Sequence, residues 1–181
     1  QRGAYVRRLK EQVLPMLPEK NFNLVLITMA GRQAALYEEA RQRLELSLKS
    51  MDNATFRKSL ATYFQQRSAL LQICACPEAI DPTFSDTSAK LEALDKIVEK
   101  VVESGHKKLI IWSFYRASLH GIMDRYTKYS PVLLDGSASA KERSESVNRF
   151  QNDPEVRVCV ANPAAAGAGI RGRKRCFISS P

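Results

Sequence analysis

A loop of small residues carries the clearest chemical potential in this chain. It covers residues 161–170 and contains Gly167 and Gly169, directly after an apolar run that begins at Val156. Glycine tolerates positive φ and leaves backbone N–H groups open, so such a loop can cradle a phosphate of a nucleotide or of a nucleic-acid backbone. It is not a Walker A loop, because no Gly-Lys-Ser/Thr follows. Tight strand–helix packing is the alternative interpretation of the same residues.

Two further stretches place hydroxyl and guanidinium groups where a phosphate could be held. Residues 112–116 read Trp-Ser-Phe-Tyr-Arg, which makes Ser113 and Arg116 candidate phosphate contacts. The alternative is a set of core aromatics followed by a helix start. A basic cluster, Arg-Gly-Arg-Lys-Arg at residues 171–175, could grip phosphates or form a solvated turn.

Other chemistries find little support in the sequence. The two histidines, His106 and His120, stand in no metal-ligand or nucleophile pattern and are interpreted as surface or structural residues. The four cysteines lack a second pair at zinc-ligand spacing and are interpreted as reduced thiols of an intracellular protein: Cys74, Cys76, Cys159 and Cys176. We therefore predict no metal site and no catalytic residue set in this chain.

The elements that must position these loops alternate between helix and strand after residue 87. Short apolar runs predict strands at residues 109–114, 131–134, from Val156 onward, and 176–179. Between them, helices are predicted from the N-cap Ser88 to Gly105, then to about residue 126, and from the capping box of Ser139 and Glu142 to residue 150. This alternation predicts an α/β fold with a parallel sheet covered on both faces, whose ligands gather at the carboxyl ends of the strands.

The first half of the chain has a different pattern. Residues 22–29, Phe-Asn-Leu-Val-Leu-Ile-Thr-Met, predict a strand. Residues 32–48 and 54–73 have helical periodicity, and Pro77 and Pro82 bracket an irregular connection. A helical insertion therefore precedes the α/β part.

Composition and charge limit the classes of protein. The chain has 181 residues, 44% of them hydrophobic, which suits one sizeable domain with or without an extension. No apolar window approaches the length of a membrane span. The net charge of +9 fits a polyanion partner such as nucleic acid, or alternatively a solvated basic surface.

Several short motifs, taken in order from about Tyr5 to Pro181, resemble the second ATPase lobe of the Swi/Snf-type DNA translocases in helicase superfamily two. The matching stretches are Val-Arg-Arg-Leu-Lys at 6–10 with Leu-Pro-Glu-Lys at 17–20, Gln33 with Tyr37, Leu-Gln-Ile-Cys-Ala-Cys-Pro at 71–77, Ser-Ala-Lys-Leu-Glu at 88–92, motif IV at 108–114, Leu-Asp-Gly-Ser at 134–137 with Arg143 and Phe150, and motif V at 165–170. Their order and spacing make the resemblance specific.

The resemblance implies a RecA-like lobe of an ATP-driven motor on double-stranded DNA. In that family two lobes close on ATP and Mg²⁺, the second lobe grips the DNA backbone through motifs IV and V, and motif VI arginines reach the nucleotide. With Arg116 added from the residue pattern, the residues expected to face DNA are Ser113, Arg116, Gly136, Ser137 and Asn162. The residues expected at the ATP cleft are Gly167, Gly169 and Arg171.

The chain departs from the family at motif V. Asn162 and Pro163 stand where Ser or Thr is usual, so an amide would replace the hydroxyl contact with phosphate. Ala164 carries no charge where a basic side chain is expected, and Arg171 follows Ile170 where Asn-Leu-Thr is usual. Asn162, Pro163 and Ala164 favour an alternative hypothesis, a non-catalytic RecA-like protein-interaction domain.

We expect three segments: residues 1–30 entering the lobe with its first strand, residues 31–87 as a helical, protrusion-like insertion, and residues 88–181 as the RecA-like core, ending before motif VI. A Walker A lysine and an acidic metal box are absent from this sequence, so the chain alone is expected to be inactive toward ATP. The expected partners are the DNA backbone and the N-terminal lobe of the same polypeptide. The expected location is intracellular, cytoplasmic if prokaryotic, as the form of motif V favours, and nuclear if eukaryotic.

Overall fold

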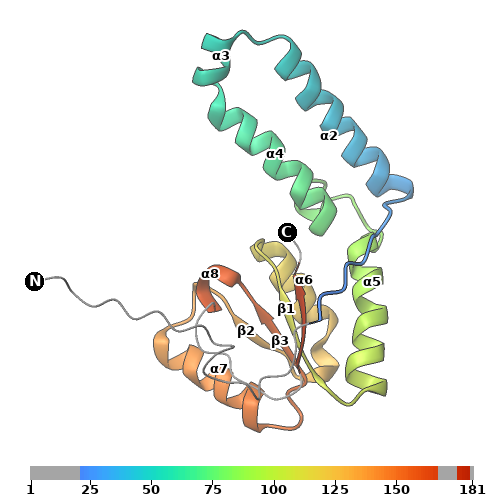
Figure 1. Ribbon diagram of the computed structural model, residues 1–181, viewed down its shortest axis with the longest axis vertical. Helices are drawn as coiled ribbons and strands as arrows, with labels where there is room; N and C mark the ends of the chain where they lie inside the picture. The colour runs from blue at the N-terminus through green and yellow to red at the C-terminus, as the bar shows by residue number, and fades with distance from the viewer. Residues whose placement is uncertain (1–20, 167–174, 180–181) are drawn as a thin grey trace, which may run out of the picture.

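Four parallel strands form the sheet around which the helices are arranged (Figure 1). The computed structural model describes residues 21–166 and 175–179. The order across the sheet is β2 (Val132–Leu134), β3 (Val158–Ala161), β1 (Lys108–Trp112) and β4 (Arg175–Ser179). In the parallel register, Ile110 of β1 is opposite Cys159 of β3. The predicted α/β class with a parallel sheet is confirmed.

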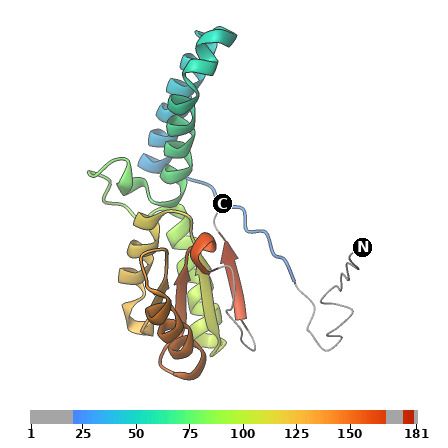
Figure 2. The same ribbon diagram turned by 90° about the vertical axis from the view of Figure 1, so that its left-hand side faces the viewer.

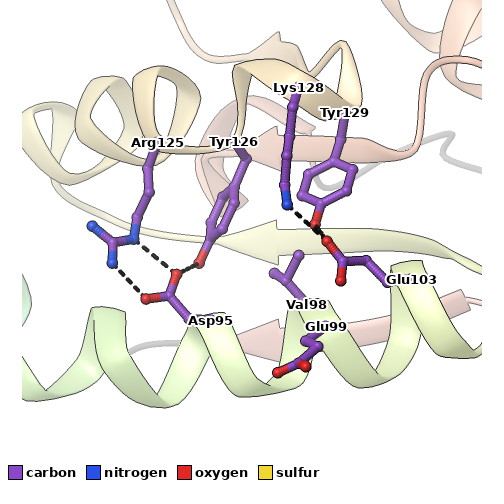
Figure 3. A pocket seen from close by; sticks show the side chains of 8 residues that line it. All are labelled: Asp95, Val98, Glu99, Glu103, Arg125, Tyr126, Lys128 and Tyr129. Atoms are coloured by element: carbon purple, nitrogen blue, oxygen red, sulfur yellow. Dashed lines mark hydrogen bonds and ion pairs between the residues drawn. The ribbon is translucent and has the colours of Figure 1, made fainter.

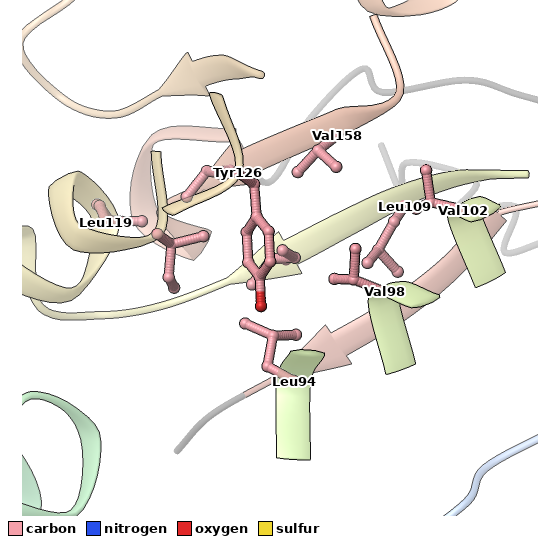
Figure 4. Packing of buried hydrophobic residues seen from close by; sticks show 10 residues of the cluster. Leu94, Val98, Val102, Leu109, Leu119, Tyr126 and Val158 are labelled. Atoms are coloured by element: carbon pink, nitrogen blue, oxygen red, sulfur yellow. The ribbon is translucent and has the colours of Figure 1, made fainter. Parts of the chain in front are cut away.

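The two central strands are buried, as expected for a parallel sheet with helices on both faces. All four residues of β3 and the middle three of β1 are buried. One face is covered by α5 (Ala89–Val98), its continuation η2 (Glu99–Ser104) and α6 (Arg116–Arg125), whose side chains meet those of β1 and β3 in one cluster (Figure 4). The other face is covered by α7 (Ala140–Asn152), which buries Phe150 against β2 and β3.

The helices of this part begin where local chemistry predicts. Ser88 caps α5 by accepting a hydrogen bond from the Leu91 N–H, and Ser139 forms the predicted capping box with Glu142 at the start of α7. Gly105 ends the helix before β1, as predicted, but the last turn is a π-helix rather than an α-helix.

A helical arm projects from one end of the sheet (Figure 1). It consists of α2 (Gly31–Lys49), α3 (Asn53–Lys58) and α4 (Leu60–Ala75), followed by the single turn η1 (Pro77–Ala79). The predicted helix over residues 54–73 is wrong in one respect, because it is interrupted at Ser59, between α3 and α4. There the N–H of Ser59 bonds to the carbonyls of both Thr55 and Phe56, which closes α3 before α4 begins.

The strand predicted at residues 22–29 is not formed. Residues 21–30 have no regular secondary structure, and the side chains of Phe22, Leu24 and Leu26 are 87–89% exposed. Figure 2 shows this segment separated from the sheet. A strand needs a neighbour to pair its N–H and C=O groups, and within residues 21–166 and 175–179 the sheet runs only from β2 to β4. Among these residues no helix is long and apolar enough to cross a membrane.

Candidate nucleic-acid interface

The loops that follow β1, β2 and β3 are tied together by hydrogen bonds. The backbone N–H of Ser113 donates to the carbonyl of Ala161 at 3.1 Å, and that of Asn162 donates to the carbonyl of Leu134 at 2.9 Å. The side-chain Nδ2 of Asn162 donates to the carbonyl of Phe114 at 3.3 Å. These bonds join three predicted loops at one edge of the sheet, so the DNA-facing candidates of motifs IV and V lie on neighbouring strand ends.

The turn after β2 is organised by Asp135, whose side chain is buried. Its Oδ1 accepts hydrogen bonds from the N–H and the hydroxyl of Ser137. The hydroxyl bond from Ser137, its backbone N–H bond and the nearby guanidinium of Arg116 hold the pKa of Asp135 below its ordinary value. Gly136 is exposed, and a Cβ built on it would meet no atom within 4 Å, so there is free space beside its open peptide.

Arg116 and His120 lie on α6 beside this turn. Arg116 is the first residue of the helix, immediately after the loop that follows β1, and both side chains are exposed. Four residues separate them, so they share one face of the helix. Helix α6 packs beside β2 and β3, which brings Arg116 close enough to act electrostatically on Asp135. Arg116 stays a predicted DNA contact, and His120, interpreted from the sequence as a surface or structural residue, is exposed on the same face.

Ser113 and Asn162 both use their side chains to shape the loops. Ser113 is 1% exposed, and its Oγ accepts a hydrogen bond from the N–H of Tyr115. Its hydroxyl therefore does not face solvent. Asn162 is partly exposed, and its Oδ1 accepts from the N–H of Ala164 at 2.9 Å, at the start of α8 (Pro163–Ala166). An amide nitrogen has two hydrogens, so one Nδ2–H of Asn162 remains for a ligand after the bond to Phe114.

Phe114 was not singled out from the sequence as a site residue, yet it is 53% exposed at the same edge. It lies between the buried Ser113 and the helix that begins at Arg116. An exposed aromatic ring there offers apolar contact area next to the candidate phosphate contacts.

Gly167, Gly169 and Arg171, together with the basic cluster at residues 171–175, lie outside the residues whose side chains the structure describes. Their assignment to the ATP cleft therefore stays a prediction. Within residues 21–166 and 175–179, no group of three or more His, Cys, Asp or Glu side chains is arranged to hold a metal ion. Cys74 and Cys76 are free thiols, and burial raises the pKa of Cys76 to about 11, so it is not a reactive thiolate at neutral pH.

A second polar groove lies between α5–η2 and the turn η3 (Thr127–Tyr129) (Figure 3). Four of its charges form two ion pairs: Arg125 binds Asp95, and Lys128 lies 2.7 Å from Glu103. The hydroxyl of Tyr126 also donates to Asp95. These contacts attach α6 and η3 to α5, and we assign the groove to packing rather than to ligand binding.

The parallel sheet with helices on both faces is of the RecA-like α/β class. No family profile matches the chain. The chain is 32% identical over 188 residues to the chromatin structure-remodeling complex subunit snf21 of Schizosaccharomyces pombe. This match covers 93% of the chain and 15% of that protein. It is 27% identical over 176 residues to the human DNA annealing helicase and endonuclease ZRANB3, covering 91% of this chain and 14% of that protein.

Among solved structures, the fold resembles the Sulfolobus solfataricus SWI2/SNF2 ATPase core in complex with double-stranded DNA, with a TM-score of 0.66 and 22% identity over 75% of this chain and 29% of the other. The chain is thus a RecA-like lobe similar to the C-terminal ATPase lobe of Swi/Snf-type proteins, and the expected resemblance is confirmed. It spans about one seventh of the length of the curated relatives named here. These relatives are eukaryotic, so the prokaryotic preference gains no support from them.

Proposed function

We propose that this chain is the second lobe of an ATP-dependent DNA translocase, and that its carboxyl-edge loops grip the phosphates of duplex DNA. One observation carries the proposal: hydrogen bonds join the three strand-end loops beside the exposed side chain of Arg116. The names of the relatives, a chromatin-remodelling subunit and a DNA annealing helicase, support DNA as the partner. The solved archaeal core was determined with double-stranded DNA.

The described residues of this interface have two roles, contact with phosphate and support of the loops. Arg116, the open peptide of Gly136 and the remaining amide hydrogen of Asn162 contact phosphate, because a cation and N–H donors are what a phosphate oxygen binds. Ser113 and Ser137 hold the backbone of the loops in place, since their hydroxyls are engaged inside the protein. Each group then contributes to affinity without reading base sequence.

ATP and Mg²⁺ belong to the complete protein in this proposal. A first lobe of the same polypeptide would bind most of the nucleotide, while Gly167, Gly169 and Arg171 would face it from this lobe. Residues 31–87 form the helical insertion and residues 88–181 the core, and the protein acts inside the cell. The non-catalytic interaction domain is not favoured, because relatives matched over most of the chain include DNA-remodelling enzymes.

The proposal is tested by fluorescence anisotropy of duplex DNA titrated with the chain over a salt series. Each phosphate contact contributes a slope of about −0.9 to log affinity against log salt. The Arg116→Ala variant is expected to weaken binding on all DNA sequences and to flatten the slope by about one contact. Arg149→Ala is the matched control, because Arg149 is exposed in the last turn of α7, beside the start of β1 and away from the strand-end loops. Salt-independent affinity, or an equal effect of the two variants, would contradict the proposal.

A further inference from the structure

A buried glutamine connects the helical arm to the lobe. Gln33, in the first turn of α2, is 4% exposed. Its Nε2 donates to the carbonyl of Ile73 near the end of α4, and its Oε1 accepts from the N–H of Ala89 at the start of α5, both at 2.9 Å. One carboxamide thus joins both long helices of the arm to the first helix of the lobe.

The neighbouring Arg32 adds a second, exposed attachment. Its guanidinium bonds to the carboxylate of Asp81 at 2.6 Å and to the carbonyl of Thr83 at 3.1 Å, in the connection between arm and lobe. Asp81 is itself held by the N–H and hydroxyl of Thr83. Gly31 precedes this pair with a φ of 53°, a conformation that favours glycine. Arg32 therefore bonds to the connection between arm and lobe, while Gln33 bonds to α4 and α5.

The attachment lies at the same end of the lobe as the candidate DNA contacts. Helix α5 leads directly into β1 and runs in the opposite direction, so its first residue, Ala89, lies at the carboxyl end of β1. The end of the arm also lies beside α6, because a Cβ built on Gly121 would be 4.0 Å from Oε1 of Glu78 in η1. Figure 1 shows the arm projecting from this end of the lobe.

We propose that Gln33 is a positioning residue that fixes the direction of the arm, so that the arm and the strand-end loops meet one DNA duplex as a single rigid surface. The DNA part of this statement rests on the proposed function. A buried carboxamide suits the role because its two hydrogen bonds have defined directions, whereas an apolar side chain would fill the same space without fixing an angle. Preorganisation of this kind raises affinity by removing the entropic cost of ordering the arm on binding.

The arm offers a surface with the charge that this role requires. From residue 53 to residue 75 there is no acidic residue, while Arg57, Lys58 and Arg67 are exposed. The arm can therefore approach a polyanion with α3 and α4, and its direction decides whether it does so together with Arg116.

The test measures the arm directly. Nitroxide labels carried on unnatural amino acids at exposed Ser50, between α2 and α3, and Glu155, before β3, report the arm-to-lobe distance by pulsed electron paramagnetic resonance. Gln33→Met keeps the approximate volume and removes both hydrogen bonds, and is expected to broaden the distance distribution. Gln42→Met is the matched control, because Gln42 lies exposed on the same helix and bonds only to Glu38 among the described residues. Hydrogen exchange of β1 and β3 checks that the lobe stays folded.

Gln33→Glu separates positioning from general packing. The ionised carboxyl at this position can accept from the N–H of Ala89 but repels the carbonyl of Ile73, so the distribution is expected to be broad at pH 9. Once protonated, the carboxyl both donates and accepts, and the distribution is expected to narrow at pH 5. The Met variant is expected to stay broad at both values. DNA affinity should fall about fivefold in the Met variant and remain unchanged in the control.

The outcomes distinguish the two proposals. An unchanged distribution in Gln33→Met with a folded lobe, or a Gln33→Glu variant that is equally broad at pH 5 and pH 9, would overturn the positioning role. Absence of DNA binding in every variant and in the unmodified chain, with distances that follow the expected pattern, would overturn the proposed function and leave Gln33 as the residue that fixes the arm.

Discussion

Asp135 receives two hydrogen bonds from Ser137, one from the backbone N–H at 3.0 Å and one from the hydroxyl at 2.6 Å. Both donors of Ser137 are thus engaged before any ligand arrives. A hydroxyl has one hydrogen, so Ser137 cannot donate it to a phosphate while it is bonded to Asp135. The turn leaves Gly136 as its open peptide and presents a preformed backbone rather than a flexible hydroxyl.

The Ser137→Ala variant is expected to shift the acid sensitivity of the fold. Because the pKa of Asp135 is depressed in the folded state, its ionised form contributes stability above the unfolded pKa of about 3.9, and this contribution is lost as pH falls through the folded value. Removing the hydroxyl raises the folded pKa toward the ordinary one. We expect a loss of about 1.5–3 kcal/mol at pH 7 and a smaller difference from the unmodified chain at pH 3, measured by urea unfolding.

Ser144→Ala is the control for this experiment, because Ser144 is exposed on α7 and lies outside the turn. It should unfold like the unmodified chain at both pH values. A difference between Ser137→Ala and the unmodified chain that is equally large at pH 3 and pH 7 would show that the hydroxyl acts independently of the ionised carboxylate of Asp135.

Replacing Gly105 or Gly136 by alanine is expected to have different effects on stability and on DNA binding. A Cβ on Gly105 would lie 2.8 Å from the carbonyl oxygen of Val101, so Gly105→Ala should reduce stability by about 1–3 kcal/mol through a clash with the backbone. A Cβ on Gly136 meets nothing, so Gly136→Ala should change stability by less than about 0.5 kcal/mol and weaken DNA binding by covering the open peptide. Urea unfolding and DNA anisotropy measure the two effects. Full DNA affinity in Gly136→Ala would remove this peptide from the interface.

The parts of the fold that local chemistry determines could be predicted from the sequence. Ser88 and Ser139 cap helices with their own side chains, and the apolar runs of β1 and β3 can only be buried strands in this α/β pattern. The segment at residues 22–29 has equally good strand composition, but pairing depends on a neighbour that composition does not supply. The interruption of the helix at Ser59 depends on one N–H that bonds to the carbonyls of both Thr55 and Phe56, and it has no strong sequence signal.

The candidate site was predicted from residue type, and its DNA contacts stay predictions. Residue type alone does not show which hydroxyls are already engaged in hydrogen bonds within the protein. Ser113 and Ser137 look like phosphate contacts in the sequence, yet each bonds to its own loop. Gln33 was visible as part of a motif, but only the fold shows that its amide bridges two helices.

The chain alone is expected to release no phosphate from ATP. The resemblance assigns the phosphate-binding lysine and the acidic metal ligands to a first lobe, and no Gly-Lys-Ser/Thr sequence occurs in these 181 residues. A phosphate-release assay with ATP, Mg²⁺ and duplex DNA should match the blank without protein. Turnover above that blank, retained through two different purification routes, would contradict the assignment of the chain to a second lobe that needs a partner.

Tyr126 and Asp95 are expected to show strong energetic coupling across the groove in Figure 3. Tyr126 is 3% exposed and its hydroxyl donates to Oδ1 of Asp95 at 2.9 Å, while Nε of Arg125 donates to the same oxygen at 2.8 Å. Tyr126→Phe should cost about 0.5–1.5 kcal/mol of unfolding free energy, the ordinary value of one hydrogen bond. Asp95→Ala should cost about 1–3 kcal/mol, since it leaves the hydroxyl of Tyr126 buried without this acceptor.

A double-mutant cycle between these positions measures the coupling by urea unfolding. In the Tyr126→Phe background the hydroxyl is gone, so Asp95→Ala should cost less there than in the unmodified chain. Lys96→Ala, at an exposed position next to Asp95 on α5, serves as the control and should combine additively with Tyr126→Phe. If Asp95→Ala also combined additively with Tyr126→Phe, the hydrogen bond would contribute nothing to holding α6 against α5.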